Sequence, residues 1–173
     1  MRIETASHAD LPAIAALHAE NWRREYAGLL PAEALQGRLA PYMARRWGAA
    51  ALTGATVLVA RAATDLAGFV ALKPDHPDGL LVDNLHVAAS ARGRGLGRAL
   101  MLAAAESAGD RPVWLLVFDG NHATRAIYRG WGGQEGPVFE DNILDTPIPA
   151  RPVRWSSGRE LGARLRQVAR QAP

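Results

Sequence analysis

The stretch Leu80–Met101, LLVDNLHVAASARGRGLGRALM, decides how the rest of this 173-residue chain is interpreted. Its first part, 80–87, is apolar and rich in residues that favour strands, so the pattern predicts a strand. The segment 92–97, RGRGLG, follows and is expected to lead directly into a helix. Backbone N–H groups in such a turn lack partners and meet the positive end of the helix dipole, which makes the turn an anion site. Positive charge is added by three arginines, Arg92, Arg94 and Arg98. The loop is therefore predicted to bind a phosphorylated ligand.

Two common phosphate-binding patterns do not fit the glycine spacing. A P-loop requires a lysine after its second glycine, and the only lysine of the chain, Lys73, lies outside the loop. A dinucleotide-binding turn requires a third glycine where this chain has Arg98. The pattern that remains is Arg92-x-x-Gly95-x-Gly97. It resembles the acetyl-coenzyme A signature, Gln/Arg-x-x-Gly-x-Gly/Ala, of the GNAT superfamily of N-acetyltransferases.

Other segments resemble the same superfamily. Residues 85–87 (LHV) look like its central strand, and residues 22–31 (WRREYAGLLP) look like the end of its first helix and the following loop, which wall the acceptor site. Asn121 is followed seven residues later by Tyr128, a spacing of about two helical turns that is similar to the superfamily's second motif helix. The superfamily usually places Gly-Phe or a similar pair after this tyrosine, whereas this chain has WGG at 131–133.

The resemblance implies an α+β (mixed α/β) fold with a central twisted mixed sheet of six or seven strands flanked by helices. The two central strands, here 80–87 and 113–118, are expected to splay apart, with the pantetheine arm of acetyl-coenzyme A between them. The residues implied to bind this cosubstrate are Leu85, His86, Val87, Arg92, Gly93, Arg94, Gly95, Leu96, Gly97, Arg98, Asn121, Arg125 and Tyr128.

Catalytic roles also follow from the resemblance. Backbone groups of Leu85 and Val87 are implied to hold the arm, and an N–H near His86 or Val87 is implied to polarise the acetyl carbonyl. The Tyr128 hydroxyl is implied to donate a proton to the departing thiolate, which leaves more easily when protonated. The structural alternative for Tyr128 is a half-buried aromatic whose hydroxyl bonds locally.

An N-acetyltransferase also needs a group that takes a proton from the amine that is acetylated, and four residues are candidates for it. Asp83 is the first candidate, because a regular strand would place it on the same face as Leu85 and Val87. A bulge in the strand would change that parity. A solvent-facing or capping role competes with catalysis for Asp83 and equally for the alternatives, which are Glu25, His18 and His86.

The residues predicted to line the acceptor side are Trp22, Glu25, Tyr26 and Asn84. The alternative for Trp22 and Tyr26 is that, four residues apart on one helix, they only cover the core. The acidic segment 140–142 (EDN) could meet a cationic acceptor, but an exposed acidic turn explains it better.

The composition of the chain excludes several other classes of function. The chain has no cysteine, which excludes disulfides, thiolate metal sites and cysteine nucleophiles and fits a reducing cytoplasm. Five scattered histidines have no ligand spacing, so no metal is expected. The net charge of +3 comes mainly from arginines spread along the chain, which favours a solvated basic surface over a nucleic-acid site. No secretory signal and no apolar run of membrane-spanning length is visible, so no membrane partner is expected.

A single domain, 1–158, is expected to carry the GNAT fold, followed by a helical tail at 159–173. Three arrangements of the tail remain open: it docks on the domain, it mediates a homodimer, or it frays. The last strands are predicted at 139–142 and 151–156, joined by a connection rich in proline.

The sequence therefore predicts a cytoplasmic enzyme that transfers acetyl from acetyl-coenzyme A to the primary amine of a small molecule or peptide, by direct attack in a ternary complex. One alternative is a non-catalytic module that binds coenzyme A or acyl-coenzyme A as a sensor or scaffold. Another is a nucleic-acid-binding protein, which would show steeply salt-dependent affinity. The identity of the amine stays open.

Overall fold

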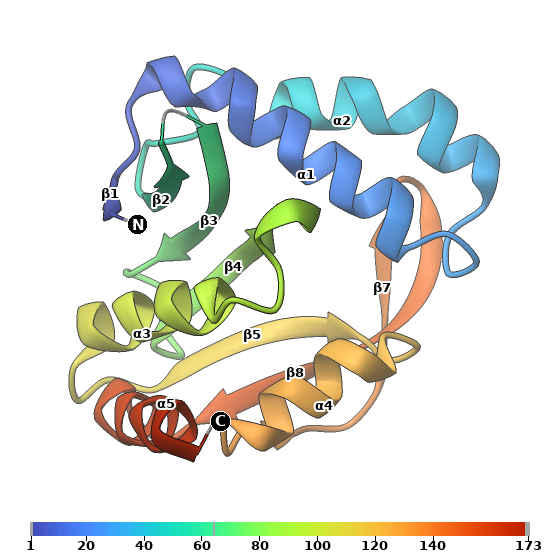
Figure 1. Cartoon of the computed structure of the whole chain (residues 1–173). Helices are drawn as coiled ribbons and strands as arrows, with labels where there is room; N and C mark the ends of the chain where they lie inside the picture. Colours follow the sequence, from blue (N-terminus) through green and yellow to red (C-terminus); the bar gives the residue numbers. More distant parts are fainter. Residues whose placement is uncertain (1, 64, 172–173) are drawn as a thin grey trace.

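Eight strands form one sheet in the order β1-β2-β3-β4-β5-β8-β6, with β7 also paired to β8 (Figure 1). The computed structural model describes residues 2–63 and 65–171. The strands are β1 (Arg2–Thr5), β2 (Thr56–Ala62), β3 (Asp65–Lys73), β4 (Leu80–Val87), β5 (Val113–Phe118), β6 (Gln134–Glu135), β7 (Phe139–Ile143) and β8 (Thr146–Trp155). The mixed α+β architecture matches the expectation, and the two-residue β6 makes the sheet one strand larger than expected.

Five α-helices accompany the sheet: α1 (Leu11–Glu25), α2 (Leu39–Arg46), α3 (Leu96–Ala108), α4 (His122–Gly130) and α5 (Gly158–Gln171). A π-helical turn, Ala34–Arg38, leads into α2. Pro12 stands in the first turn of α1, where its missing N–H costs nothing. Within the ranges described, no helix has the length and apolar character needed to cross a bilayer.

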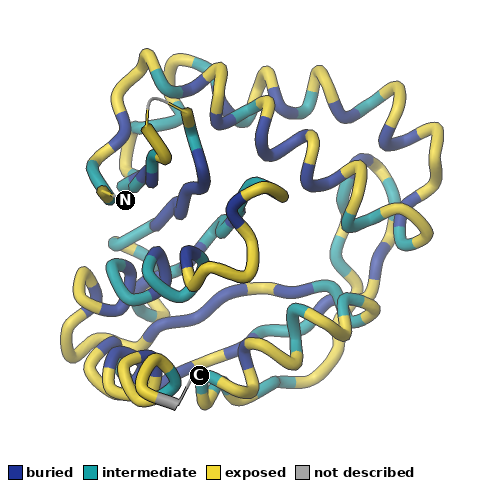
Figure 2. Tube along the Cα trace, in the orientation of Figure 1, coloured by how far each residue is buried: buried dark blue, intermediate teal, exposed yellow. Residues whose placement is uncertain are grey.

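The helices cover the two faces of the sheet and create two apolar cores. Side chains of α1 and α2 pack on one face with Phe69 and Val59, both fully buried. Side chains of α3 and α5 pack on the other face around Leu100, Met101 and Leu80. Figure 2 shows buried positions along the central strands and exposed positions on the outer sides of the helices. The sheet is therefore a middle layer whose strands are held from both sides.

Helix α5, the main part of the predicted tail, docks on α3. Leu161 and Leu165 are fully buried in the α3-side core. Gly158 begins the helix so close to α3 that a Cβ there would lie 2.2 Å from the carbonyl oxygen of Ala105. The last two residues of the predicted tail, 172–173, lie outside the described residues. The described part of the tail therefore docks on the domain.

The last hairpin differs from the sequence prediction. Strand β8 begins at Thr146, directly after a two-residue turn in which Leu144 and Asp145 both have positive φ. Pro147 and Pro149 therefore lie inside β8, facing Asn142 and Glu140 across the ladder. In an antiparallel ladder next to a two-residue turn, these are positions whose N–H is not needed by the partner strand. The prediction of a proline-rich connection was wrong for this reason.

The two central strands separate as expected. Strands β4 and β5 are parallel and pair only at Leu80↔Val113 and Leu81↔Trp114. Beyond those pairs the rest of β4 has no partner on the β5 side, and β5 continues its pairing only with β8. The sheet therefore opens along its middle, and the functional residues gather at this opening.

Candidate active site

A β-bulge at Asp83 changes the direction of the side chains along β4. In the register with β3, Leu72 faces Val82 and Ala71 faces Asn84, so Asp83 is the extra residue. The Asp83 carboxylate pairs with Arg46 of α2, whereas Leu85 and Val87 pack on the α3-side core. The regular-strand expectation, with Asp83 on the face of Leu85 and Val87, was therefore wrong, because the bulge shifts the alternation by one residue.

The edge of β4 beyond the bulge is open toward the gap. The N–H of Ala88 donates to the carbonyl of Ala67 in β3 at 2.8 Å. Because backbone directions alternate along a strand, the N–H and C=O groups of Val87 and Leu85 point away from β3. The Val87 carbonyl accepts a bond from the Asn21 side chain of α1 at 3.1 Å. The open edge is therefore anchored at its end by α1.

The glycine loop turns into α3 through left-handed backbone. Gly93 has φ of +72° and Gly95, the residue before the helix, has φ of +75°. L-residues with a Cβ adopt this region at a cost, so the turn uses glycine where it needs it. Among residues 2–63 and 65–171, no side chain caps the N-terminus of α3, so its first N–H groups have no side-chain acceptor there.

A cavity of about 350 Å³ extends from this loop to α4. The predicted cosubstrate residues that line it are Leu85, His86, Val87, Arg92, Gly93, Gly95, Leu96, Gly97, Arg98 and Tyr128. It is also lined by Trp131, the residue at which the chain departs from the superfamily pattern. We call it the loop cavity. Arg94, Asn121 and Arg125 do not line it.

Arg92 has protein partners at the rim of the loop cavity. Its guanidinium pairs with the Glu25 carboxylate and also donates to Oδ1 of Asn21 at 3.1 Å. Its Nε donates to the carbonyl of Val87 at 3.3 Å. The first residue of the signature thus links the loop to α1 and to the end of β4.

Arg125 belongs to an ion network between α4 and the strands β6 and β8. Its guanidinium donates to both carboxylate oxygens of Glu135, at 2.9 and 2.8 Å, and to Asp119 at 2.8 Å. Arg151 of β8 joins the same two carboxylates. Hydrogen bonds to Glu135 raise the pKa of Arg125 and lower that of Glu135. Through these ion pairs Arg125 links α4 to the sheet.

A second cavity, of about 270 Å³, lies on the other side of the opening and is lined by α1, α2, β4, β5 and β7. We call it the acceptor cavity. The predicted residues that line it are Trp22, Glu25, Tyr26, Asp83, Asn84, Leu85, His86, Asn121 and Tyr128. Asn121 also caps α4, because its Oδ1 accepts the Thr124 N–H at 3.3 Å.

The two cavities share five lining residues: Glu25, Leu85, His86, Thr124 and Tyr128. The two cavities therefore meet at a junction formed by α1, β4 and α4. Asp83 lines the acceptor cavity and not the loop cavity, and Lys73 lies 3.4 Å from its carboxylate in addition to the Arg46 pair. Of the carboxylates considered from sequence, only Glu25 reaches the junction.

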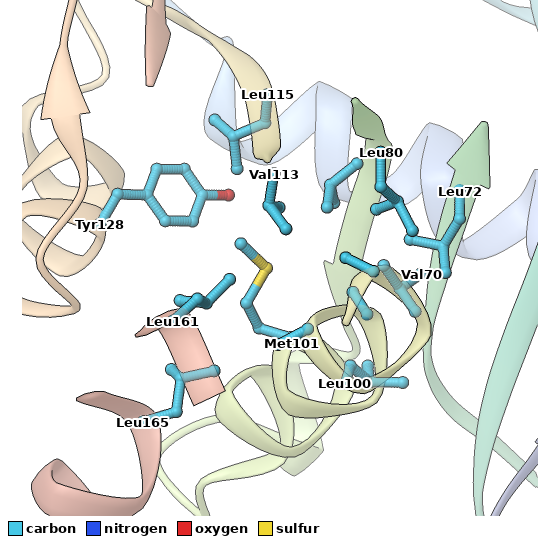
Figure 3. Close-up of a cluster of buried hydrophobic side chains, with 14 of the residues drawn as sticks. Val70, Leu72, Leu80, Leu100, Met101, Val113, Leu115, Tyr128, Leu161 and Leu165 are labelled. Atoms are coloured by element: carbon cyan, nitrogen blue, oxygen red, sulfur yellow. The ribbon is translucent and has the colours of Figure 1, made fainter. Parts of the chain in front are cut away.

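Tyr128 extends from α4 into the sheet opening. Figure 3 shows its hydroxyl directed away from α4, toward the labelled side chains of β5 and α3. Burial, and secondarily the charge of Glu25, raise the pKa of the Tyr128 hydroxyl above its ordinary value. No hydrogen bond of this hydroxyl is found within 2–63 and 65–171. The group therefore keeps its proton at neutral pH and is available to a ligand.

The histidines considered as bases are buried, and their rings lie side by side at a tilt of 38°. The ring centroids of His18 and His86 are 4.3 Å apart. Trp47 Nε1 donates to His18 Nδ1 at 2.9 Å, which leaves no proton on that nitrogen. Burial, with neighbouring cationic groups adding to it, lowers the pKa of His18 to about 2 and that of His86 to about 3. Both imidazoles are neutral, and their weak basicity makes them poor proton acceptors.

Asn21 is the site residue that sequence reasoning missed. It is fully buried, and its side chain contacts Val87, His86 and Arg92, so it joins α1 to β4 and to the glycine loop. The available signal was an amide on the otherwise apolar face of α1. Buried amides need several partners, which makes such a position informative.

The family model described as the acetyltransferase (GNAT) family matches residues 14–132. This chain belongs to that family. The search of curated proteins found no match. Among solved structures, the chain is similar to a GCN5-related N-acetyltransferase from Rhodopseudomonas palustris, with a TM-score of 0.72, 21% identity, and coverage of 88% of this chain and 93% of that chain.

Two further GNAT-like structures share the fold. Ribosomal-protein-alanine N-acetyltransferase from Brucella melitensis has a TM-score of 0.62, 22% identity, and coverage of 90% of this chain and 99% of that chain. YncA from Salmonella typhimurium, a putative acetyltransferase solved with acetyl-coenzyme A, has a TM-score of 0.61, 19% identity, and coverage of 90% and 92%. At these identities the likeness concerns the fold. Membership of the GNAT family identifies the protein as an acetyltransferase.

Proposed function

We propose that this GNAT protein transfers the acetyl group of acetyl-coenzyme A to an amine by direct attack in a ternary complex. The observation that carries the proposal is the meeting of the loop cavity and the acceptor cavity at Glu25 and Tyr128. Two substrates can enter from opposite sides of the sheet opening and meet at a buried proton donor and a carboxylate.

The loop cavity has the groups that acetyl-coenzyme A needs. The open edge of β4 at Leu85 and Val87 offers backbone groups to the amides of the pantetheine arm. The unpaired N–H groups at the start of α3 and the Arg98 side chain offer positive potential to the pyrophosphate. The Salmonella YncA structure, which holds acetyl-coenzyme A, supports the same choice of cosubstrate.

The N–H of Val87 is the proposed donor to the acetyl carbonyl. It points into the gap, and the Asn21 bond to the carbonyl of the same residue fixes its direction. A pre-positioned donor stabilises the negative charge that develops on the carbonyl oxygen during attack. Asn21 is therefore a positioning residue for this donor.

Glu25 is the proposed proton acceptor. Its carboxylate lies at the junction of the two cavities, whereas Asp83 lines the acceptor cavity and not the loop cavity and is held by Arg46 and Lys73. As the amine nitrogen bonds to the acetyl carbon, its proton passes to Glu25, directly or through water. The C–S bond then breaks, and the thiolate receives the proton of Tyr128.

The test is Tyr128→Phe, assayed for thiol release with a panel of amines. Removal of the proposed proton donor is expected to lower kcat by about 100-fold, while coenzyme A still binds in calorimetry. Unchanged kcat in Tyr128→Phe would remove the tyrosine from the mechanism.

The two carboxylates are compared in the same assay. Glu25→Gln is expected to lower kcat about 100-fold and Asp83→Asn much less, since only Glu25 reaches the junction. The reverse order would assign the base to Asp83. A wild-type protein that binds acetyl-coenzyme A and acetylates no amine would instead be the sensor or scaffold module.

A further inference from the structure

The acceptor cavity has a continuous aromatic wall. Tyr42 stacks on Trp22 with ring centroids 5.3 Å apart, Trp22 meets Tyr26 at 5.3 Å, and Tyr26 meets Phe118 at 4.6 Å. All four rings line the cavity. Ring faces attract cations, and their surfaces accept apolar chains. The wall therefore suits a molecule that has both an alkyl body and positive charge.

Three carboxylates line the same cavity, and two of them are already neutralised. Glu25 is paired with Arg92, and Asp83 is paired with Arg46, the only cationic side chain in the lining. Asp141 makes no ion pair with any residue in the described part of the chain. It is the carboxylate whose charge is left for a ligand.

The position of Asp141 on β7 turns it toward the cavity. Across the ladder it faces Ile148, which is buried in the core on the α1 and α2 side. Glu140 faces Pro149 and is exposed, as is Asn142. The expected acidic turn is a part of strand β7, in which Glu140 and Asn142 are exposed and Asp141 is half-buried. Figure 1 shows β7 rising beside the C-terminal end of α1, which brings this distant segment to the aromatic wall.

Asp141 lies away from the reacting end of the cavity. Glu25 and Tyr128 line both cavities, whereas Asp141 and Tyr42 line only the acceptor cavity. Burial is the main cause that raises the pKa of the Tyr42 hydroxyl; the Arg46 charge lowers this pKa, and the carboxylates of Asp83 and Asp141 raise it further. A molecule that fills the cavity can therefore place one end at the junction and the other between Tyr42 and Asp141.

From this arrangement we infer that the acceptor is a diamine, with a second positive charge remote from the amine that is acetylated. This inference rests on the proposed function and names the acceptor class of the same site. The free ammonium group binds the Asp141 carboxylate against the ring of Tyr42. The alkyl chain lies along Trp22 and Tyr26, and the reacting amine reaches Glu25.

The test uses terminal diamines of increasing length, each paired with the monoamine of the same carbon count. The wild-type protein is expected to prefer the best diamine over its monoamine by about tenfold or more in kcat/KM, the ratio expected when one charge-assisted contact is gained. Asp141→Asn should remove most of this preference by lowering kcat/KM for the diamine toward that for the monoamine. A melting temperature close to the wild-type value shows that the variant is folded.

The matched control is Glu140→Gln, which removes the same charge one residue away on the outward face of β7. It is expected to keep the diamine preference. Equal kcat/KM for diamine and monoamine would overturn the inference and leave the proposed acetyl transfer standing. Preference for an amine that bears a carboxylate would overturn it in favour of recognition by Arg46. Absence of transfer to any amine would instead contradict the proposed function.

Discussion

The guanidinium of Arg92 is ion-paired with the carboxylate of Glu25, so the first residue of the glycine signature is bonded to helix α1. The pair crosses from the loop that faces the cosubstrate to the helix that walls the acceptor. The superfamily signature also accepts glutamine at the position of Arg92. A glutamine at position 92 cannot form an ion pair with Glu25. The kinetics of Arg92→Gln therefore show whether Arg92 positions Glu25 or binds phosphate.

Arg92→Gln is expected to lower kcat by about tenfold, because Glu25 loses the partner that holds it at the junction. The KM for acetyl-coenzyme A should change less than about threefold, since backbone N–H groups supply most of the phosphate contacts. Steady-state kinetics with a fixed amine measure both quantities. Arg23→Gln, an exposed position on α1, is the charge-matched control. A large rise in KM with unchanged kcat would show that Arg92 binds phosphate.

Arg125→Gln is expected to lower the free energy of unfolding measurably, because Glu135 and Asp119 lose a shared cationic partner. Urea unfolding measures this free energy. Arg129→Gln removes a more exposed partner of Glu135 and should cost less than about 1 kcal/mol. The KM for acetyl-coenzyme A tests the role implied by the family resemblance. If that KM rises while stability is kept, Arg125 contacts the cosubstrate.

Acid should destabilise the protein through His18 and His86. Their folded pKa values, about 2 and about 3, lie below the ordinary value of 6.5, so the unfolded chain binds protons first as the pH falls. The stability from the neutral pair is fully present above about pH 6.5 and decreases below it, by about 2 kcal/mol for each histidine near pH 5.

Urea unfolding near pH 7 and near pH 5 measures this loss. His18→Asn keeps an acceptor for Trp47 and removes one titrating group, so it should reduce the difference between the two pH values. A wild-type protein equally stable at both pH values would contradict the buried neutral pair.

The glycines of the signature should differ in their tolerance of alanine. Gly95→Ala places a Cβ at φ of +75°, which costs about 1–2 kcal/mol. Gly97→Ala places its Cβ 3.7 Å from Val87 Cγ2, an ordinary contact, at a helical position where alanine is favoured by about 1 kcal/mol. Thermal unfolding without ligand measures the melting temperature of each variant. We expect the melting temperature of Gly95→Ala to lie below that of the wild type, and that of Gly97→Ala to equal or exceed it. The opposite rank would show that the left-handed turn is not required.

The sequence determined the local elements around the glycine loop. The bounds of β4 and β5 agree with the predicted 80–87 and 113–118, and helices α3 and α4 follow the glycine loop and Asn121 as expected. These segments are bounded by glycine, proline and a capping asparagine, whose backbone preferences act within a few residues. The spacing of Arg92, Gly95 and Gly97, together with the strand before it and the helix after it, indicated the GNAT family.

Only the tertiary structure decided which side chains meet. The bulge at Asp83 depends on pairing with β3, and it moved that carboxylate to α2. Asp141 faces the acceptor cavity because β7 pairs with β8, a contact that no local pattern encodes. Side-chain parity along a strand changes with a single inserted residue, and long-range pairing is set by burial of the whole sheet. The glycine loop proposed to bind the cosubstrate can therefore be recognised in the sequence, whereas the acceptor cavity is formed only when distant segments come together in the fold.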